Sequence, residues 1–293
     1  MMTNACTVLI ALMTAAPEHQ DANPIYGQLL QTGVALSDDV QIPLPAPLMA
    51  DGLAADAQQQ IYTDAAGGNA RLNQFLKPSV VARHVLRMDE LTDPDAPGRR
   101  ADVYFVTYGN LELFESQEFL ESLLSSGQED DEIGTDNHEM TVAELADRGI
   151  DFKPENERFE AYVHGSYALI KLIRVDATLH SYWTRTPDSF LVAAVIDPRF
   201  ADDPEYPNTW RPIERTNTGQ QQLGAPQHYG GVGFYVKITQ LTEPAGALFV
   251  ESHLVFSEPY DWFDGANLLG SKLPALIQNR VRATRREIMR SSD

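Results

Sequence analysis

Two apolar segments near the end of the chain alternate with polar residues, and a third repeats its apolar residues at helical spacing. Residues 234–241 and 247–256 have the period of two that β-strands show, and Thr242-Glu-Pro-Ala-Gly246 between them has the composition of a turn. From about Gly265 onward the apolar side chains recur at steps of three and four, which predicts an amphipathic helix. This stripe consists of Leu273, Leu276, Ile277, Val281, Thr284 and Ile288. Residues 227–290 are therefore predicted to form a long β-hairpin followed by a helix.

The middle of the chain has the same strand-like character. Residues 101–108 are β-branched and aromatic, and residues 159–178 carry many Tyr, Val and Leu side chains. Residues 179–185 and 190–196 read as two further strands, because Thr186-Pro-Asp-Ser189 between them has turn chemistry. Residues 197–224 are polar and contain proline, and we expect them to form an ordered surface excursion.

The N-terminal part of the chain predicts helices. Gly33 ends a short one over residues 25–31, and Gly67-Gly68 ends another over residues 53–66. Between them, three prolines at alternate positions in residues 42–48 predict a polyproline-like strip or an edge strand. Further along, residues 115–124 are amphipathic at helical spacing, and Thr141-Val-Ala-Glu144 is a capping box for a short helix.

These elements together predict an α+β fold: an antiparallel sheet with a long C-terminal amphipathic helix packed on it, and a helical N-terminal part. We expect residues 17–293 to form a single domain, with a weak internal break near residues 125–140. That stretch contains the acidic run Glu129-Asp-Asp-Glu132, which is typical of a solvated loop.

Composition and charge exclude one class of partner. The 42 acidic residues outnumber the 22 basic ones and give a formal net charge of −20, so a phosphate backbone would be repelled and nucleic acid is not an expected partner. The predicted C-terminal helix is an exception to this excess of acidic residues, because it carries a local basic face. Its members are Arg280, Arg282, Arg285, Arg286 and Arg290.

The first residues resemble a targeting sequence. Residues 5–16 form an apolar run of signal-peptide length, and small residues at Ala15 and Ala16 suit cleavage, although no Lys or Arg precedes the run. Residues 1–16 are therefore predicted to be a signal peptide and the protein to be exported to the periplasm or cell envelope; the alternative is a cytoplasmic protein. No other stretch reaches the ~20 apolar residues needed to span a bilayer.

Candidate chemistry is sparse, and we predict no catalytic residue, cofactor or metal. The cluster Gly230-Gly-Val-Gly233 leads into a strand, not a helix, so it favours close backbone packing over nucleotide binding. A hydrolase using Ser166, His164 or His180 is kept as an alternative, although the second glycine of a nucleophile elbow is missing. Glu251 and His253 share one face of a strand, and we expect that face to be polar and outward.

Several segments of the chain resemble those of a known group of proteins. They are Asn23-Pro-Ile-Tyr26, the proline-rich strip before Asp51-Gly-Leu53, Tyr235-Val-Lys-Ile-Thr239, residues 243–259, Trp262-Phe-Asp-Gly-Ala-Asn-Leu-Leu269 and Ser271-Lys-Leu-Pro274. In these segments the chain resembles a group of uncharacterised bacterial exported proteins. This resemblance implies export and one unit of constant length, and it implies no site residue. The predicted sheet and terminal helix are also similar in architecture to START-like helix-grip proteins, in which the helix closes a lipid-sized cavity; this is an analogy of fold alone.

The leading functional hypothesis is a non-enzymatic, exported protein that binds a small apolar ligand or a partner in a cavity between sheet and helix. A structural or envelope-associated protein, whose basic helix meets an anionic surface, is a further alternative. The candidate ligand-binding residues are Trp183, Trp210, Arg211, Tyr235, His253 and Trp262. The sequence leaves the ligand and the oligomeric state open.

Overall fold

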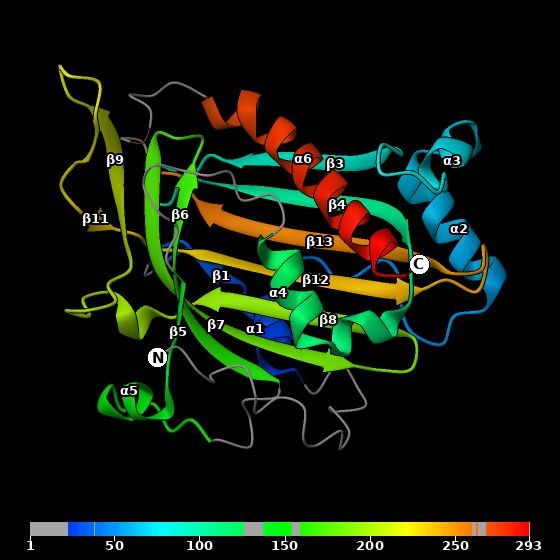
Figure 1. The fold of residues 1–293 in the computed structure, drawn as a ribbon, viewed down its shortest axis with the longest axis horizontal. Helices are drawn as coiled ribbons and strands as arrows, with labels where there is room; N and C mark the ends of the chain where they lie inside the picture. Colours follow the sequence, from blue (N-terminus) through cyan, green and yellow to red (C-terminus); the bar gives the residue numbers. More distant parts are fainter. Residues whose placement is uncertain are drawn as a thin grey trace.

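A large antiparallel sheet with helices on both of its faces organises the molecule (Figure 1). The computed structural model describes residues 23–37, 39–125, 137–153, 159–259, 262 and 268–292. Within these residues the sheet has eleven strands, and every pair of neighbouring strands runs antiparallel. The long helix α6 (Leu268–Arg290) packs across one face. The predicted α+β class, with an antiparallel sheet and a C-terminal helix on it, is confirmed.

The main path of the sheet runs in the order β10-β9-β7-β8-β12-β13-β4-β3. The strand β7 is a branch point, because β6 pairs along one of its sides, while β9 and then β8 pair along the other. The strand bounds are β3 (His84–Leu91), β4 (Gly98–Tyr108), β5 (Asn137–Glu139), β6 (Glu160–Leu169), β7 (Ile173–Arg185), β8 (Ser189–Ile196), β9 (Thr209–Arg215), β10 (Gln221–Leu223), β11 (Gln227–His228), β12 (Val232–Gln240) and β13 (Ala247–Ser257).

The predicted hairpin is the centre of the sheet. In β12 and β13, Tyr235 lies opposite His253 and Lys237 lies opposite Glu251. The hairpin is extended on both sides, since β8 pairs with β12 and β4 pairs with β13. The strand β4 precedes the expected internal break and β13 follows it, so this pairing joins the two parts of the chain in one sheet. Residues 126–136, with the acidic run, lie outside the described residues, as does the N-terminal leader.

One face of the sheet packs against α6, against α4 (Gln117–Ser125) and against the short 3-10 helix Leu111–Glu115. The buried side chains from these helices and from alternate strand positions form one cluster. It includes Val103, Phe105, Phe114, Phe119, Phe190, Ile238, Leu248, Val250, Val281 and Ile288. This is the packing expected when an amphipathic helix buries its apolar stripe on a strand face of period two.

The N-terminal part of the chain covers the opposite face. This part comprises α1 (Pro24–Gln31), the short pair β1 (Val34–Ala35) and β2 (Gln41–Ile42), α2 (Ala55–Ala66) and α3 (Asn69–Phe75). Tyr26 packs edge-on against Tyr235 at 5.2 Å between ring centroids, and Phe75 packs on Phe249. Asn23 caps α1 by accepting the backbone N–H of Tyr26 at 2.9 Å.

The glycine cluster before β12 serves this close packing, as predicted. A Cβ atom on Gly231 would lie 2.0 Å from the carbonyl oxygen of Ala35, and one on Gly233 would lie 2.6 Å from Val34 Cγ2. Neither distance leaves room for a side chain. The two glycines therefore allow β1 to cross directly over the start of β12.

Two stretches fold differently from the prediction. Residues 159–178 lie in the sheet as expected, but they form β6 and the first part of β7, so residues 179–185 continue β7 and are not a separate strand. The tight turn between β6 and β7 places Ile170 and Lys171 at positive φ, although neither is the glycine or asparagine usual there. The excursion over residues 197–224 contains β9, which pairs with the first part of β7 and so belongs to the sheet. The predicted capping box at Thr141 and Glu144 is confirmed at the start of α5 (Val142–Asp147).

Candidate functional site

The structure separates the six candidate ligand-binding residues into three places. Tyr235 and His253 are fully buried beneath the N-terminal part of the chain. Trp210 and Trp262 lie at the end of the sheet near β9, where their rings meet at 6.1 Å and Tyr229 stacks on Trp262. Trp183 packs into the cluster beneath α6 and α4, and Arg211 lies beside Trp210 on β9. These side chains do not line one common cavity among the described residues.

Tyr235 and His253 belong to a buried polar network, and here the prediction of an outward face is wrong. The side chains of Glu251 and His253 are both 0% exposed. His253 Nδ1 lies 2.6 Å from Asp102 Oδ1, and its Nε2 lies 3.9 Å from Glu251 Oε2. Strand alternation does place these groups opposite Val250, as expected. Both faces are buried, because the N-terminal part of the chain covers the second one.

The network holds residues 44–52, a segment outside the helices and strands, which we call the strap. Glu251 accepts the backbone N–H groups of Leu48 at 2.7 Å and of Met49 at 3.1 Å. Lys237 donates to the carbonyl of Met49 and forms an ion pair with Asp51 at 2.9 Å. Because backbone groups without a strand partner need other hydrogen bonds, these buried charges take the place of a ladder for the strap.

Burial and neighbouring charges shift the pKa values of this network in opposite directions. Burial by itself would lower the pKa of His253, but the hydrogen bond to Asp102 and the charge of Glu251 outweigh it and raise that pKa. Burial would raise the pKa of Asp102, but His253 and Arg100 lower it. His253 Nε2, 3.9 Å from Glu251 Oε2, has no hydrogen-bond partner among the described residues.

The residues of the alternative hydrolase hypothesis lie on one sheet face but form three separate pairs. The Ser166 hydroxyl donates to Asp176 at 2.5 Å and accepts from Arg174 at 2.7 Å. His164 Nδ1 contacts Thr178 Oγ1 at 3.0 Å, and His180 Nε2 contacts Glu160 at 2.6 Å. A serine nucleophile needs a base within hydrogen-bond reach, and neither histidine is the partner of Ser166. The arrangement is a set of cross-strand pairs on β6 and β7.

The basic face of α6 is partly internal. Arg285 is 1% exposed, and it donates to the carbonyls of Val106 and Arg83, each at 2.9 Å, and to that of Ala82 at 2.5 Å. These carbonyls lie where β3 begins opposite Phe105, so no strand is available to bond them. Sequence spacing could have found this residue, because position 285 falls on the same helical face as Val281 and Ile288. Arg286, by contrast, is exposed.

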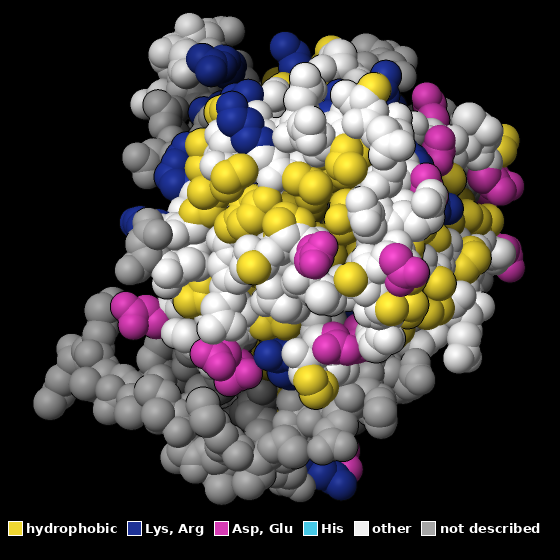
Figure 2. Space-filling view, turned by 90° about the vertical axis from the view of Figure 1, so that its right-hand side faces the viewer, with side chains coloured by type: hydrophobic (Ala, Val, Ile, Leu, Met, Phe, Trp, Pro, Cys, Tyr) yellow, Lys and Arg dark blue, Asp and Glu magenta, His cyan; other side chains and the backbone are white. Residues whose placement is uncertain are grey.

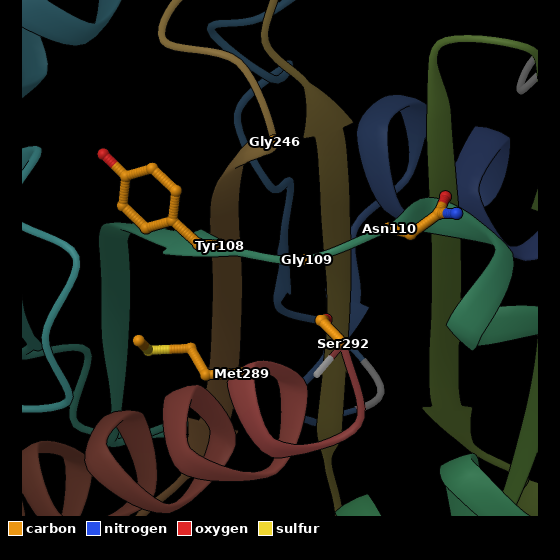
Figure 3. Close-up of a pocket in the computed structure, with 6 residues that line it drawn as sticks. All are labelled: Tyr108, Gly109, Asn110, Gly246, Met289 and Ser292. Carbon is orange, nitrogen blue, oxygen red and sulfur yellow. The ribbon is translucent and has the colours of Figure 1, made fainter.

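Two open depressions adjoin α6. The first, of about 400 Å³, lies at its C-terminal end, where Figure 3 shows Met289 of α6 and Ser292, just after the helix, near Tyr108, Gly109 and Asn110. A Cβ on Gly109 would lie 2.6 Å from Ile288 Cγ2, so helix and strand touch at this point. The depression is the outer rim of that contact. It offers few directed polar groups, since the Tyr108 hydroxyl is already bonded to the carbonyl of Leu76.

The second depression, which we call the β3–α6 groove, has the features of a binding surface. Its volume is about 520 Å³, which falls in the range of ligand sites. One wall is the chain entering and beginning β3, and the other is a single face of α6. The lining residues are Arg83, His84, Val85, Leu86, Ser271, Pro274, Ala275 and Gln278. Nothing in the sequence pattern marked this groove, because it depends on how α6 crosses the edge of the sheet.

The groove is locally cationic. Burial lowers the pKa of His84, and the nearby charges of Arg285, Arg282 and Arg83 lower it further. Figure 2 shows Lys and Arg side chains gathered at the upper left, on the side of the molecule that carries α6, whereas Asp and Glu lie mostly lower and to the right. In a chain of net charge −20, this is a distinct surface for a negatively charged group.

Comparisons with known proteins show no family. No protein-family model and no curated protein matches the chain. A solved structure of an uncharacterised protein from Rhizobium leguminosarum is similar over 71% of this chain and 99% of its own, with 9% sequence identity and a TM-score of 0.34. The resemblance to exported bacterial proteins therefore stays a prediction. No described helix is both long and apolar enough to cross a bilayer.

Proposed function

We propose that this chain is a non-enzymatic binding protein, and that the β3–α6 groove is its binding site. The observation that carries the proposal is the groove itself, which combines apolar, polar and cationic side chains beside a sheet edge that no described strand pairs. In binding sites, a few charged or polar groups orient the ligand while apolar side chains contact the rest of it. The ligand class is accordingly an apolar molecule or partner segment that carries negative charge.

The distribution of the other polar groups supports a binding role over a catalytic one. Ser166, His164 and His180 are each engaged in a separate hydrogen bond, and the buried network around His253 is occupied in holding the strap. We further propose export, on the strength of the apolar run at residues 5–16. The leader lies outside the described residues, and N-terminal sequencing of the native protein tests its removal after Ala15 or Ala16.

The binding proposal is tested with anilinonaphthalene sulfonate, an apolar fluorescent anion. We expect saturable binding with one dominant site. Ala275→Phe, which fills the groove, should abolish it, whereas Leu276→Phe should not. Leu276 is the matched control, because it is exposed on the same helix and does not line the groove. Equal binding by the wild type and both variants, or equal loss in both variants, contradicts the proposal.

A further inference from the structure

The strand β3 ends the main path of the sheet, and no described strand pairs with its outer edge. Among the described residues it pairs with β4 alone, from His84 opposite Phe105 to Leu91 opposite Gly98. The backbone N–H and C=O groups of alternate β3 residues therefore point away from the sheet. Such an edge can be extended by an added strand. The second half of β3 carries Asp89 and Glu90, both exposed, whereas the first half adjoins the groove.

The helix α6 forms a wall beside the first half of this edge. In Figure 1 the first turns of α6 extend past β3, beyond the edge of the sheet. The helix residues that line the groove are spaced as one helical face, at positions 271, 274, 275 and 278. Ser271 and Ala275 are small, so a chain lying along β3 can approach the helix backbone closely. A strand edge next to a helix wall is a geometry that accepts an extended peptide.

The positive charge of the groove favours acidic peptides over basic ones. Among the described residues, neither Arg83 nor Arg282 forms an ion pair, and a buried Nε of Arg83 has no hydrogen-bond partner. Lys272 is exposed one residue after Ser271. An acidic segment would pair with these cations. It would also be repelled less at the groove than at the rest of the surface of this acidic protein.

We propose that the partner is an extended acidic polypeptide segment, which adds as a strand to the free edge of β3 and places its carboxylates against Arg83 and Arg282. This inference rests on the proposed function and names the class of ligand. Backbone hydrogen bonds to β3 supply sequence-independent affinity, and the arginines supply the preference for acidic side chains.

The register of β3 specifies the pattern of such a segment. Leu86 and Met88 face the α6 side of the sheet, whereas Val85 and Arg87 face the other side, where Arg87 lies over the ring of Tyr104. An added strand alternates in the same way. Side chains on its α6 side meet the helix face of Ser271 and Ala275, which Arg282 continues two turns further on. A segment that places acidic side chains on the α6 side and apolar ones on the side of Val85 therefore fits both walls.

The test uses synthetic peptides of strand length with a neutral fluorophore, followed by fluorescence anisotropy on the full chain. An alternating Val/Glu peptide should bind, and its affinity should fall in about 0.5 M salt because exposed charge pairs are screened. An alternating Val/Lys peptide should bind at least tenfold more weakly. Two further Val/Glu peptides carry N-methyl groups on alternate amides, on one strand edge or on the other. Strand addition predicts that one of them loses binding and the other keeps it.

Variants of the chain locate the site. Arg83→Gln and Arg282→Gln should each weaken Val/Glu binding at least fivefold. Arg215→Gln removes the same charge from an exposed position on β9, at the other end of the sheet, and should leave binding unchanged. Equal binding of the acidic and basic peptides, equal effects of the three variants, or equal behaviour of the two N-methylated peptides overturns the inference. If the groove takes anilinonaphthalene sulfonate but no acidic peptide, the inference fails and the proposed function stands.

Discussion

The ammonium group of Lys237 lies 2.9 Å from Oδ1 of Asp51, and it joins the central strand of the sheet to the end of the strap. The Lys237 side chain is 1% exposed, and it contacts this carboxylate and the carbonyl of Met49. Burial would raise the pKa of Asp51, but hydrogen bonds from Lys237, Thr186 and Ser189 outweigh it and lower that pKa. A buried cation and a held carboxylate thus fix where the strap crosses the sheet.

Replacement of Lys237 tests this contact. Lys237→Met should lower the free energy of unfolding by about 3 kcal/mol, because Asp51 and the Met49 carbonyl lose their buried donor. The double variant Lys237→Met/Asp51→Asn should be more stable than Lys237→Met alone, since it also removes the unpaired carboxylate. Urea denaturation of the three proteins gives the comparison. A single variant as stable as the wild type would show that the pair does not hold the strap.

Replacement of Arg285 should destabilise the protein far more than replacement of its exposed neighbour Arg286. Arg285→Met removes the donor for three carbonyls, two of them in buried hydrogen bonds, and should cost about 3 kcal/mol of stability. Arg286→Gln changes an exposed side chain and should alter stability by less than about 0.5 kcal/mol. Denaturant midpoints measured side by side decide the point, and similar losses in both variants would argue against the capping role of Arg285.

Stability should decrease as pH rises above neutrality, through His253. Its pKa is raised in the folded protein, so its stabilisation is complete below the unfolded histidine pKa of about 6.5 and is lost as pH rises through the folded value. The pKa values of His84 and His164 are lowered, so these residues act in the opposite sense. The informative quantity is therefore the difference between wild type and His253→Gln. That difference should shrink from pH 6 to pH 9, and a constant difference would exclude a charged His253.

Alanine substitutions at two glycines should have opposite effects on stability. Gly231→Ala places a methyl group 2.0 Å from the carbonyl oxygen of Ala35 and should destabilise the protein by about 2 kcal/mol or more. Gly27→Ala lies within α1, where an added Cβ meets nothing within 4 Å, and should stabilise by about 0.5–1 kcal/mol. Thermal unfolding of both variants checks the signs. A neutral Gly231→Ala would mean that β1 does not cross β12 at this distance.

Local patterns in the sequence determined the elements at the centre of this fold. Alternation over residues 234–241 and 247–256 and the stripe from Leu273 to Ile288 depend only on the geometry of single strands and helices, so the hairpin and α6 could be predicted. Alternation also placed Glu251 and His253 on the opposite face from Val250. Gly231 and Gly233 predicted that another backbone segment approaches closely, because only glycine, which has no Cβ atom, leaves room for it.

The tertiary structure decided what lies against each face. The face of Glu251 and His253 is buried because the strap crosses it, and no local pattern carries that information, since Leu48 and Glu251 are 203 residues apart in the chain. The turn at Ile170 and Lys171 adopts positive φ under the constraint of the pairing of β6 with β7. The β3–α6 groove likewise exists only because β3 is the last strand of the path and α6 crosses its edge. Element type follows from neighbouring residues, whereas burial and site formation follow from contacts between distant ones.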